Sequence, residues 1–323
     1  MLAEVLAIDI GGTSVKYSTV SVPDDGWTAK LSGVVRVPLP SRKLSDLREV
    51  VLGIARAHAS GVTAIGISTA GSVDRAGRVL GAGNFDDYVD VAWSDILTAE
   101  ILGTQRSVPV TVVNDGHAAA WGEYALSSRA ETHVHIALGT GVGGGIVHRG
   151  ELLAGESGQG GSIGHIRVTD APTIPCVCGR TGHVESFVAE RAICGLFAQE
   201  LGSAHLITPS SVREIVEGPF RDDAAFGRAL SRAGHGLGAG LGAVLNVLNP
   251  AVVTVGGGIV IALRHAPPGP FEAADALMTG IVEGMRETVN RSVFAAVECR
   301  WGDLGNDAGI VGAALLATTH GGA

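Results

Sequence analysis

Two glycine-rich turns, each placed between two strand-like segments, constrain the fold of this chain more than any other feature. The first glycine turn, at residues 11–13, separates an apolar segment at residues 2–10 from an alternating segment at residues 14–20. The second glycine turn, at residues 139–145, follows an apolar segment at residues 134–138 and precedes another strand. The repeated order of strand, turn and strand suggests an internal duplication.

The chain is rich in glycine, with 48 among its 323 residues, and poor in aromatic residues, which make up 4%. A hydrophobic content of 46% excludes a disordered chain, and the glycines do not follow the Gly-x-y period of collagen. The glycines are therefore expected where the backbone needs a positive φ or where a ligand or another backbone comes close. The length suits two domains.

The composition also excludes several classes of protein. The net charge is −9 and no basic run occurs, which argues against a nucleic-acid partner. The longest weakly polar stretch, residues 236–250, is too short to cross a bilayer, and the N-terminus does not resemble a signal peptide. Four cysteines in a chain of this length do not make a disulfide framework. We therefore expect a soluble cytoplasmic enzyme without membrane or nucleic-acid partners.

The first glycine turn carries the pattern Asp9-x-Gly11-Gly12-Thr13-x-x-Lys16. Glycines in such a turn free backbone N–H groups to face an anion, and Thr13 adds a hydroxyl. Asp9 can hold Mg²⁺ through water. An ordinary glycine-rich hairpin would not need an aspartate at the end of a buried strand, so the pattern favours phosphate binding.

The second glycine turn formally matches G-x-G-x-x-G at Gly139, Gly141 and Gly144. A dinucleotide-binding fold needs a helix after this motif, whereas a strand is predicted here. The chain has no G-x-x-x-x-G-K-[ST] motif of the Walker type either. The two glycine turns together suggest two hairpins that hold a polyphosphate.

Asn114 and Asp115 stand where a predicted strand enters a helix. Both residue types are preferred helix N-caps, and one of them would suffice for that role. A carboxylate at this place could instead take the proton from an attacking hydroxyl. The motif leaves the two interpretations open.

A short segment holds His165, then Cys176-x-Cys178, and then His183. Thiolate and imidazole are zinc ligands, and two of each would complete a tetrahedral site. The alternative is a pair of reduced thiols beside unrelated histidines. The Cys-x-Cys pattern flanked by glycine favours zinc.

Glycine also recurs at helical spacing within the predicted helix at residues 222–248, at Gly234, Gly238 and Gly242. Each glycine inside a helix costs up to about 1 kcal/mol. We therefore expect another part of the chain to pass very close to that face. Further along, residues 252–255 and 293–299 are predicted to form strands.

These motifs, in this order, resemble those of the ROK family of sugar kinases and sugar-responsive repressors. The matching segments span nearly the whole chain: DIGGTSVK at residues 9–16, STAGSVD at 68–74, NDGHAAAWGE at 114–123, LGTGVGGGIV at 138–147, SIGH at 162–165, CVCGRTGHVES at 176–186, LNPAVVTVGGGI at 248–259 and LGNDAGIVGAALLA at 304–317.

The resemblance implies the two-domain, actin-like ATPase fold of the hexokinase and ribonuclease H-like group, with ATP and a sugar in an interdomain cleft. We expect one α/β domain at residues 1–114 plus 306–323. We expect a second α/β domain, which carries the zinc loop, at residues 115–305. Relatives in this family are commonly homodimers or homotetramers.

The resemblance also implies roles for individual residues. Asp115 corresponds to the general base, and Asp9 to the carboxylate on the Mg²⁺ side. The positions expected to bind ATP are Asp9, Gly11, Gly12, Thr13, Lys16, Thr140, Gly141, Gly143, Gly256, Gly257 and Gly258. Those expected to bind the sugar are Gly71, Asn84, Asn114, Asp115, Ser162, His165 and Glu185. The expected ligands of a structural Zn²⁺ are His165, Cys176, Cys178 and His183.

Two positions depart from the family pattern. Ser162 stands where the family usually has a sugar-binding glutamate, which removes a carboxylate acceptor and leaves room for a substituent such as an N-acetyl group. His183 replaces the usual third zinc cysteine, and imidazole can still ligate the ion.

The sequence as a whole predicts an ATP- and Mg²⁺-dependent kinase that phosphorylates the 6-hydroxyl of a hexose or N-acetylhexosamine. A catalytically weak sugar sensor is the alternative, because Ser162 weakens the sugar site. A DNA-binding repressor is disfavoured, since the sequence opens directly at the first phosphate strand. The identity of the sugar, and ATP rather than polyphosphate as the donor, stay open.

Overall fold

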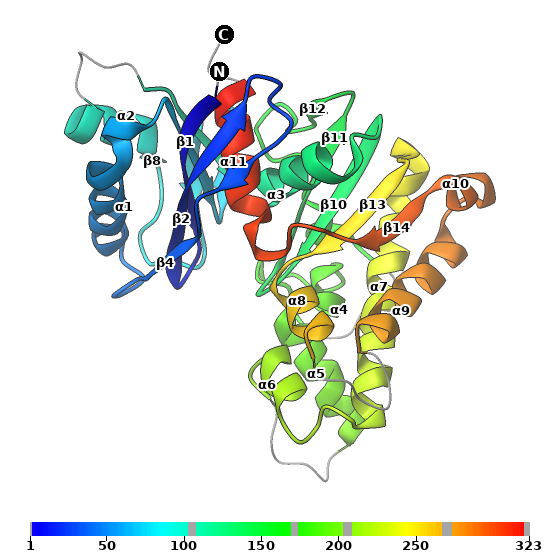
Figure 1. Ribbon diagram of the computed structural model, residues 1–323. Helices are drawn as coiled ribbons and strands as arrows, with labels where there is room; N and C mark the ends of the chain where they lie inside the picture. Colours follow the sequence, from blue (N-terminus) through cyan, green and yellow to red (C-terminus); the bar gives the residue numbers. More distant parts are fainter. Residues whose placement is uncertain (1, 103–107, 169–173, 203–208, 267–272, 320–323) are drawn as a thin grey trace. The chain divides into compact units, whose positions relative to one another are not determined.

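The computed structural model describes residues 2–102, 108–168, 174–202, 209–266 and 273–319. The chain forms two compact units (Figure 1). Unit 1 comprises Met1–Arg129, Gly145–Gly161 and Asp307–Ala323. Unit 2 comprises Ala130–Gly144 and Ser162–Asn306.

A mixed sheet in the order β3-β2-β1-β5-β9 forms the centre of unit 1. The strands β1 (Leu2–Ile10) and β2 (Ser14–Pro23) are antiparallel, and β2 also pairs with β3 (Lys30–Leu31) and β4 (Val35–Pro38). The strands β5 (Ala64–Thr69) and β9 (Val110–Asn114) run parallel to β1. The carboxyl ends of β1, β5 and β9 therefore meet at one edge of the sheet, where ligands bind in sheets of this kind.

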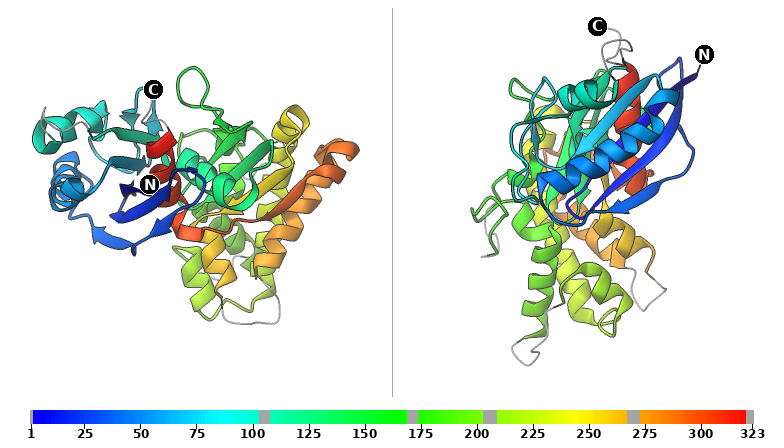
Figure 2. Two further views of the ribbon diagram at one scale, coloured as in Figure 1. Left: turned by 45° about the horizontal axis from the view of Figure 1, so that its top comes forward. Right: turned by 90° about the vertical axis from the view of Figure 1, so that its left-hand side faces the viewer.

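Helices cover both faces of this sheet (Figures 1 and 2). Helices α1 (Leu44–His58) and α2 (Trp93–Leu97) pack on Ile65 and Ile67 of β5. Gly66 lies between Ile65 and Ile67 in the strand. It therefore faces the opposite side of the sheet, because successive residues of a strand alternate between the two faces. There it packs against α11 (Ala308–Thr319), and α11 in turn contacts α3 (Asp115–Glu123) through Gly312. A small sheet of β6 (Ser72–Val73), β7 (Arg78–Gly81) and β8 (Val91–Ala92) completes the unit.

The second sheet has the order β12-β11-β10-β13-β14. Its parallel strands are β10 (Thr132–Leu138), β13 (Val252–Gly256) and β14 (Glu298–Trp301). Strand β11 (Val142–His148) begins inside the predicted second glycine turn, so residues 142–145 are strand and the turn itself is limited to residues 139–141. Strand β11 also pairs with β12 (Glu151–Leu152). The order β10, glycine turn, β11 repeats the order β1, glycine turn, β2, as the sequence predicts.

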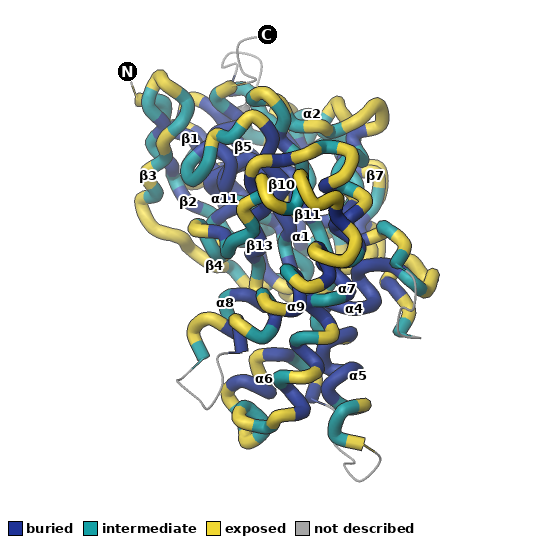
Figure 3. Tube along the Cα trace, turned by 90° about the vertical axis from the view of Figure 1, so that its right-hand side faces the viewer, coloured by how far each residue is buried: buried dark blue, intermediate teal, exposed yellow. Residues whose placement is uncertain are grey.

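Two helices of unit 2 pack on each other through glycines. The helices described in unit 2 are α4 (Glu185–Val188), α5 (Glu190–Leu201), α6 (Val212–Glu217), α7 (Ala224–Leu248), α8 (Gly258–Arg264), α9 (Ala273–Thr288) and α10 (Arg291–Ala296). Gly234, Gly238 and Gly242 of α7 face α9, so the predicted close approach is confirmed. In Figure 3, long stretches of α7 and the whole of β13 are buried.

Two further features differ from the predictions. The predicted strand at residues 293–299 is wrong, because residues 291–296 form α10 and β14 begins only at Glu298. The Asn290 side chain caps α10 by accepting a hydrogen bond from the Ser292 N–H, a local signal that outweighs the β-forming Val293 and Phe294. The division into units also differs from the predicted boundary after residue 114, since α3 groups with unit 1, where it packs on α11. Within the described residues, no helix is long and apolar enough to cross a membrane.

Candidate active site

The first glycine turn presents a carboxylate held by two partners. Asp9 Oδ2 lies 3.1 Å from Lys16 Nζ, and Asp9 Oδ1 accepts a hydrogen bond of 2.9 Å from Ser68 Oγ. Sequence reasoning did not assign Ser68 a role. The parallel register pairs Asp9 of β1 with Ser68 of β5, and the sequence signal for this contact was the hydroxyl that opens the STAGSVD segment at residues 68–74.

Predicted phosphate and sugar positions meet beside this turn. A Cβ atom on Gly12 would lie 2.9 Å from Cβ of Asn84, which places the first glycine turn directly against a predicted sugar residue. Gly71 has φ +98° and lies so close to Gly81 O that a side chain would not fit. Its carbonyl oxygen accepts a hydrogen bond of 2.8 Å from Asn114 Nδ2.

Asn114 and Asp115 make different hydrogen bonds in the structure, and only Asn114 is the N-cap of α3. Asn114 Oδ1 accepts hydrogen bonds from the N–H groups of Gly116 and His117, so Asn114 is the N-cap of α3. Asp115 Oδ1 accepts from Gly116 N and from Asn114 Nδ2. Within the described residues, Asp115 Oδ2 makes no hydrogen bond and is available to a substrate hydroxyl.

The Asp115 side chain reaches solvent but is closely surrounded by protein atoms. This desolvation disfavours the charged form, and the negative charge of Asp9 adds to the effect. Together they raise the pKa of Asp115 to about 6. A carboxylate with such a pKa is ionised at neutral pH and is a stronger base than an ordinary aspartate.

In unit 2 the second glycine turn lies at the carboxyl end of β10, and Gly256–Gly258 lie at the carboxyl end of the adjacent parallel strand β13. Gly257 has φ +94° and packs against the backbone of Leu138, the last residue before the turn. The two predicted nucleotide segments of this unit are therefore neighbours. A strand, β11, follows the turn, which confirms that this is not a dinucleotide-binding motif.

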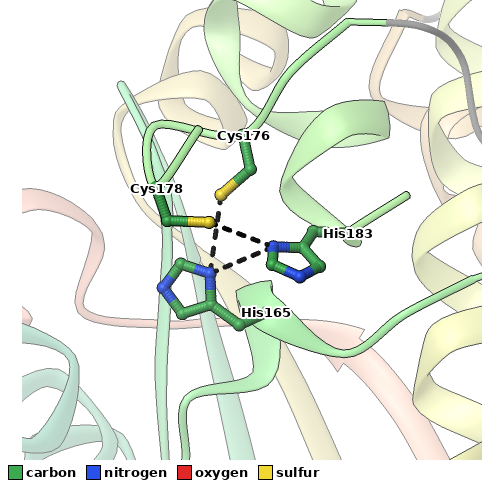
Figure 4. A group of neighbouring side chains, drawn as sticks. All are labelled: His165, Cys176, Cys178 and His183. Carbon is green, nitrogen blue, oxygen red and sulfur yellow. Dashed lines mark hydrogen bonds between the residues drawn. The ribbon is translucent and has the colours of Figure 1, made fainter. Parts of the chain in front are cut away.

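Four side chains of unit 2 converge on one point (Figure 4). His165, Cys176, Cys178 and His183, the Cys/His cluster, offer ligand atoms that all lie within 4.8 Å of one another. The two Nδ1 atoms are 3.4 Å apart, and each sulfur lies 3.5 Å from one of them. Tetrahedral zinc at ordinary bond lengths separates two nitrogens by about 3.3 Å, and a nitrogen from a sulfur by about 3.6 Å. These three distances fit a zinc site.

The remaining predicted sugar residues of unit 2 lie around this cluster. Ser162 immediately precedes the short helix Ile163–His165, which carries the first ligand of the cluster. Glu185 is 4% exposed, and its carboxylate accepts hydrogen bonds from Val177 N at 2.7 Å and Val142 N at 3.2 Å.

The predicted site residues thus fall into two groups. Unit 1 holds Asp9, Gly11, Gly12, Thr13, Lys16, Gly71, Asn84, Asn114 and Asp115. Unit 2 holds Thr140, Gly141, Gly143, Gly256, Gly257, Gly258, Ser162, Glu185 and the Cys/His cluster.

The ROK family model matches residues 5–320. The chain belongs to the ROK family. This ROK chain is 27% identical to a glucokinase from Halalkalibacterium halodurans, over 96% of its own length and 94% of that protein. It is 28% identical to an N-acetylmannosamine kinase from Yersinia pestis, over 97% of its length and 98% of that protein.

A ROK family glucokinase from Streptomyces griseus, solved in complex with glucose and AMPPNP, is 26% identical to the chain. The two structures match with a TM-score of 0.76 over 99% of this chain and 100% of the other. The predicted fold class is confirmed: this ROK protein has the actin-like, two-domain ATPase fold of its structural neighbours.

Proposed function

We propose that the protein is an ATP-dependent sugar kinase that transfers the γ-phosphate to the 6-hydroxyl of a hexose or N-acetylhexosamine. The observation that carries the proposal is the carboxylate of Asp115, whose Oδ2 has no hydrogen-bond partner among the described residues and whose pKa is raised to about 6. Glucokinase and N-acetylmannosamine kinase relatives over nearly the full length support the substrate class. In this proposal Asp115 orients the sugar hydroxyl and takes its proton.

The phosphates would lie against the first glycine turn. Asp9 fits a role toward Mg²⁺, because its carboxylate lies beside the first glycine turn and is oriented by Ser68 and Lys16. When bound, Mg²⁺ neutralises the charge that develops on the transferred phosphoryl group. The residues of the chain orient the reactants, and such positioning supplies most of the catalysis in phosphoryl transfer.

The Cys/His cluster fits a structural Zn²⁺ in both ligand chemistry and spacing, and all four positions would be filled by protein side chains. Purified protein is expected to contain about one zinc per chain by elemental analysis. His183→Ala should lower the zinc content and the unfolding midpoint, whereas His183→Cys should retain both. Cys299→Ser is the control, because the Cys299 thiol lies near Met278 and outside the cluster. Wild-type protein without zinc, purified in the absence of chelators, would contradict the assignment.

Ser162 bears on the choice of sugar. A glutamate at this place would accept hydrogen bonds from sugar hydroxyls, and bonds to a charged group contribute about 1.5–3 kcal/mol each. Serine is shorter and neutral, so the site would favour a sugar with a bulky substituent at C2. The N-acetylmannosamine kinase among the relatives is consistent with such a preference.

An ADP-release assay tests the proposal with glucose, mannose, fructose, allose, N-acetylglucosamine and N-acetylmannosamine. We expect turnover with at least one sugar and a higher kcat/KM for the N-acetylated ones. Ser162→Glu should lower the KM for plain hexoses about tenfold or more. A strong preference of the wild type for glucose over every C2-substituted sugar would contradict the proposed role of Ser162. Sugar binding without turnover across the whole panel would instead identify a sugar sensor.

A further inference from the structure

Glu185 joins two loops that are distant in the sequence. Its Oε1 accepts the Val177 N–H at 2.7 Å and lies 2.9 Å from Cys176 Sγ, so this oxygen belongs to the loop that carries the Cys-x-Cys ligands. Its Oε2 accepts the Val142 N–H at 3.2 Å, at the start of β11. One buried carboxylate therefore connects the Cys/His cluster with the second glycine turn.

The second glycine turn is shaped around this carboxylate. A Cβ atom on Gly141 would lie 2.8 Å from Glu185 Oε2, so the turn follows the surface of the carboxylate closely. On the other side of the turn, the Glu190 N–H donates to Gly139 O at 3.0 Å. The turn is thus held at both ends: the Glu190 N–H donates to its first residue, and the Glu185 carboxylate accepts from Val142 just after it. The second of these hydrogen bonds depends on the Glu185 side chain.

The Cys/His cluster also reaches the same strand by a second route. Gly164, next to the ligand His165, packs so closely on Val142 that a Cβ atom there would lie 2.3 Å from Val142 O. The backbone of Val142 is therefore held on its N–H by Glu185 and on its carbonyl side by the segment that carries a ligand. A displacement of the ligand loops would be transmitted to the start of β11.

We propose that Glu185 is a positioning residue that couples the Cys/His metal site to the second glycine turn, so that metal binding and nucleotide binding strengthen each other. This inference rests on the proposed function, in which the turn faces the phosphates. The Glu185 side chain suits this role because it is 4% exposed and both of its oxygens are engaged within the protein.

The test measures two binding equilibria without turnover. The Kd of AMPPNP is determined in the absence of sugar, with zinc-loaded and chelator-stripped protein, and the rate of zinc release to a chromogenic chelator is followed separately. In the wild type, removal of zinc should raise the Kd of AMPPNP about tenfold, within the range typical of coupled sites. Because coupling is reciprocal, AMPPNP should tighten zinc binding by the same factor.

Glu185→Gln keeps the size of the side chain but turns one acceptor oxygen into a donor that faces an N–H group. In this variant the Kd of AMPPNP should already be raised about tenfold and should no longer respond to zinc, and zinc release should be faster. Glu185→Asp keeps the charge but is too short to reach both loops, so it should show the same loss. The control is Glu190→Gln, which removes the same charge five residues away, where Oε1 accepts a hydrogen bond from Val212 N in α6.

The possible results distinguish a failure of the coupling through Glu185 from a failure of the proposed kinase function. An increase in sugar KM alone, with AMPPNP affinity and zinc release as in the wild type, would overturn the coupling and leave Glu185 with the expected sugar contact only. If the wild type bound no AMPPNP, the proposed kinase function would fail. In that case, faster zinc release from Glu185→Gln than from Glu190→Gln would still support the link to the metal loop, and equal rates would refute it.

Discussion

Asp115→Asn is expected to lower kcat about a thousandfold while AMPPNP still binds with wild-type affinity. The variant keeps the size of the side chain, and the helix cap stays intact because Asn114 provides it. The amide cannot take the proton of the sugar hydroxyl, and a positioned general base contributes about 10²–10⁴-fold to such a reaction. Asp95→Asn, on the exposed side of α2, is the control and should have wild-type kcat. Retention of more than a tenth of the activity by Asp115→Asn would refute the role of Asp115.

The pH dependence provides an independent test of the same residue. Asp115 acts as a base only when ionised, and desolvation together with Asp9 raises its pKa to about 6. The kcat/KM of the wild type should therefore be constant above about pH 7 and fall tenfold per pH unit well below pH 6. An ordinary aspartate would give a profile that stays flat down to about pH 4.

The raised pKa also has a cost in stability. Because the folded-state pKa of Asp115 lies above its unfolded value of 3.8, the fold binds this proton more tightly than the unfolded chain does. The charged form therefore destabilises the fold at pH values above about 6, and the effect disappears below about pH 4. Asp115→Asn should raise the unfolding midpoint at pH 7.5 and leave it unchanged near pH 3.5. A variant that is inactive but more stable would support a role of the Asp115 carboxylate in function and not in stability.

Local patterns were sufficient to predict the strands that carry the site. The first glycine turn and the close approach along α7 follow from glycine placement, and the structure has them at those places. The second glycine turn is shorter than predicted, because β11 already begins at Val142. The error at residues 293–299 arose because β-branched and aromatic side chains are common in strands, whereas the Asn290 cap decides this segment.

The partners of the site residues could not be predicted from spacing. Ser68 reaches Asp9 only because β1 and β5 pair in one particular parallel register, and a single sequence does not fix that register. The engagement of both Glu185 oxygens depends on the folding of residues 139–142 and 176–178 around α4. The choice between capping and catalysis at residues 114 and 115 likewise needed the direction of two side chains.

The contact between α7 and α9 gives the largest stability prediction. A Cβ atom on Gly238 would lie 2.0 Å from Ile281 O and 2.8 Å from Met285 N, both in the backbone of α9. Gly280 and Gly284 of α9 face α7 in the same way. A Cβ atom added to either would lie 2.2 Å from a backbone oxygen of α7, Ser231 O or His235 O. Because glycines on both helices allow this approach and the obstructing atoms are backbone, a methyl group cannot be accommodated by a change of rotamer.

Gly238→Ala is therefore expected to lower the free energy of unfolding by about 3 kcal/mol or more, although alanine is the better helix former. Gly53→Ala is the matched control, because Gly53 lies on the exposed side of α1 with no atom within 4 Å of an added Cβ. That variant should gain up to about 1 kcal/mol from helix propensity alone. Urea unfolding measures both values, and hydrogen exchange should show faster exchange in α7 and α9 of Gly238→Ala. Equal stabilisation by the two substitutions would mean that the helices can separate without cost, and the close contact would then not stabilise unit 2.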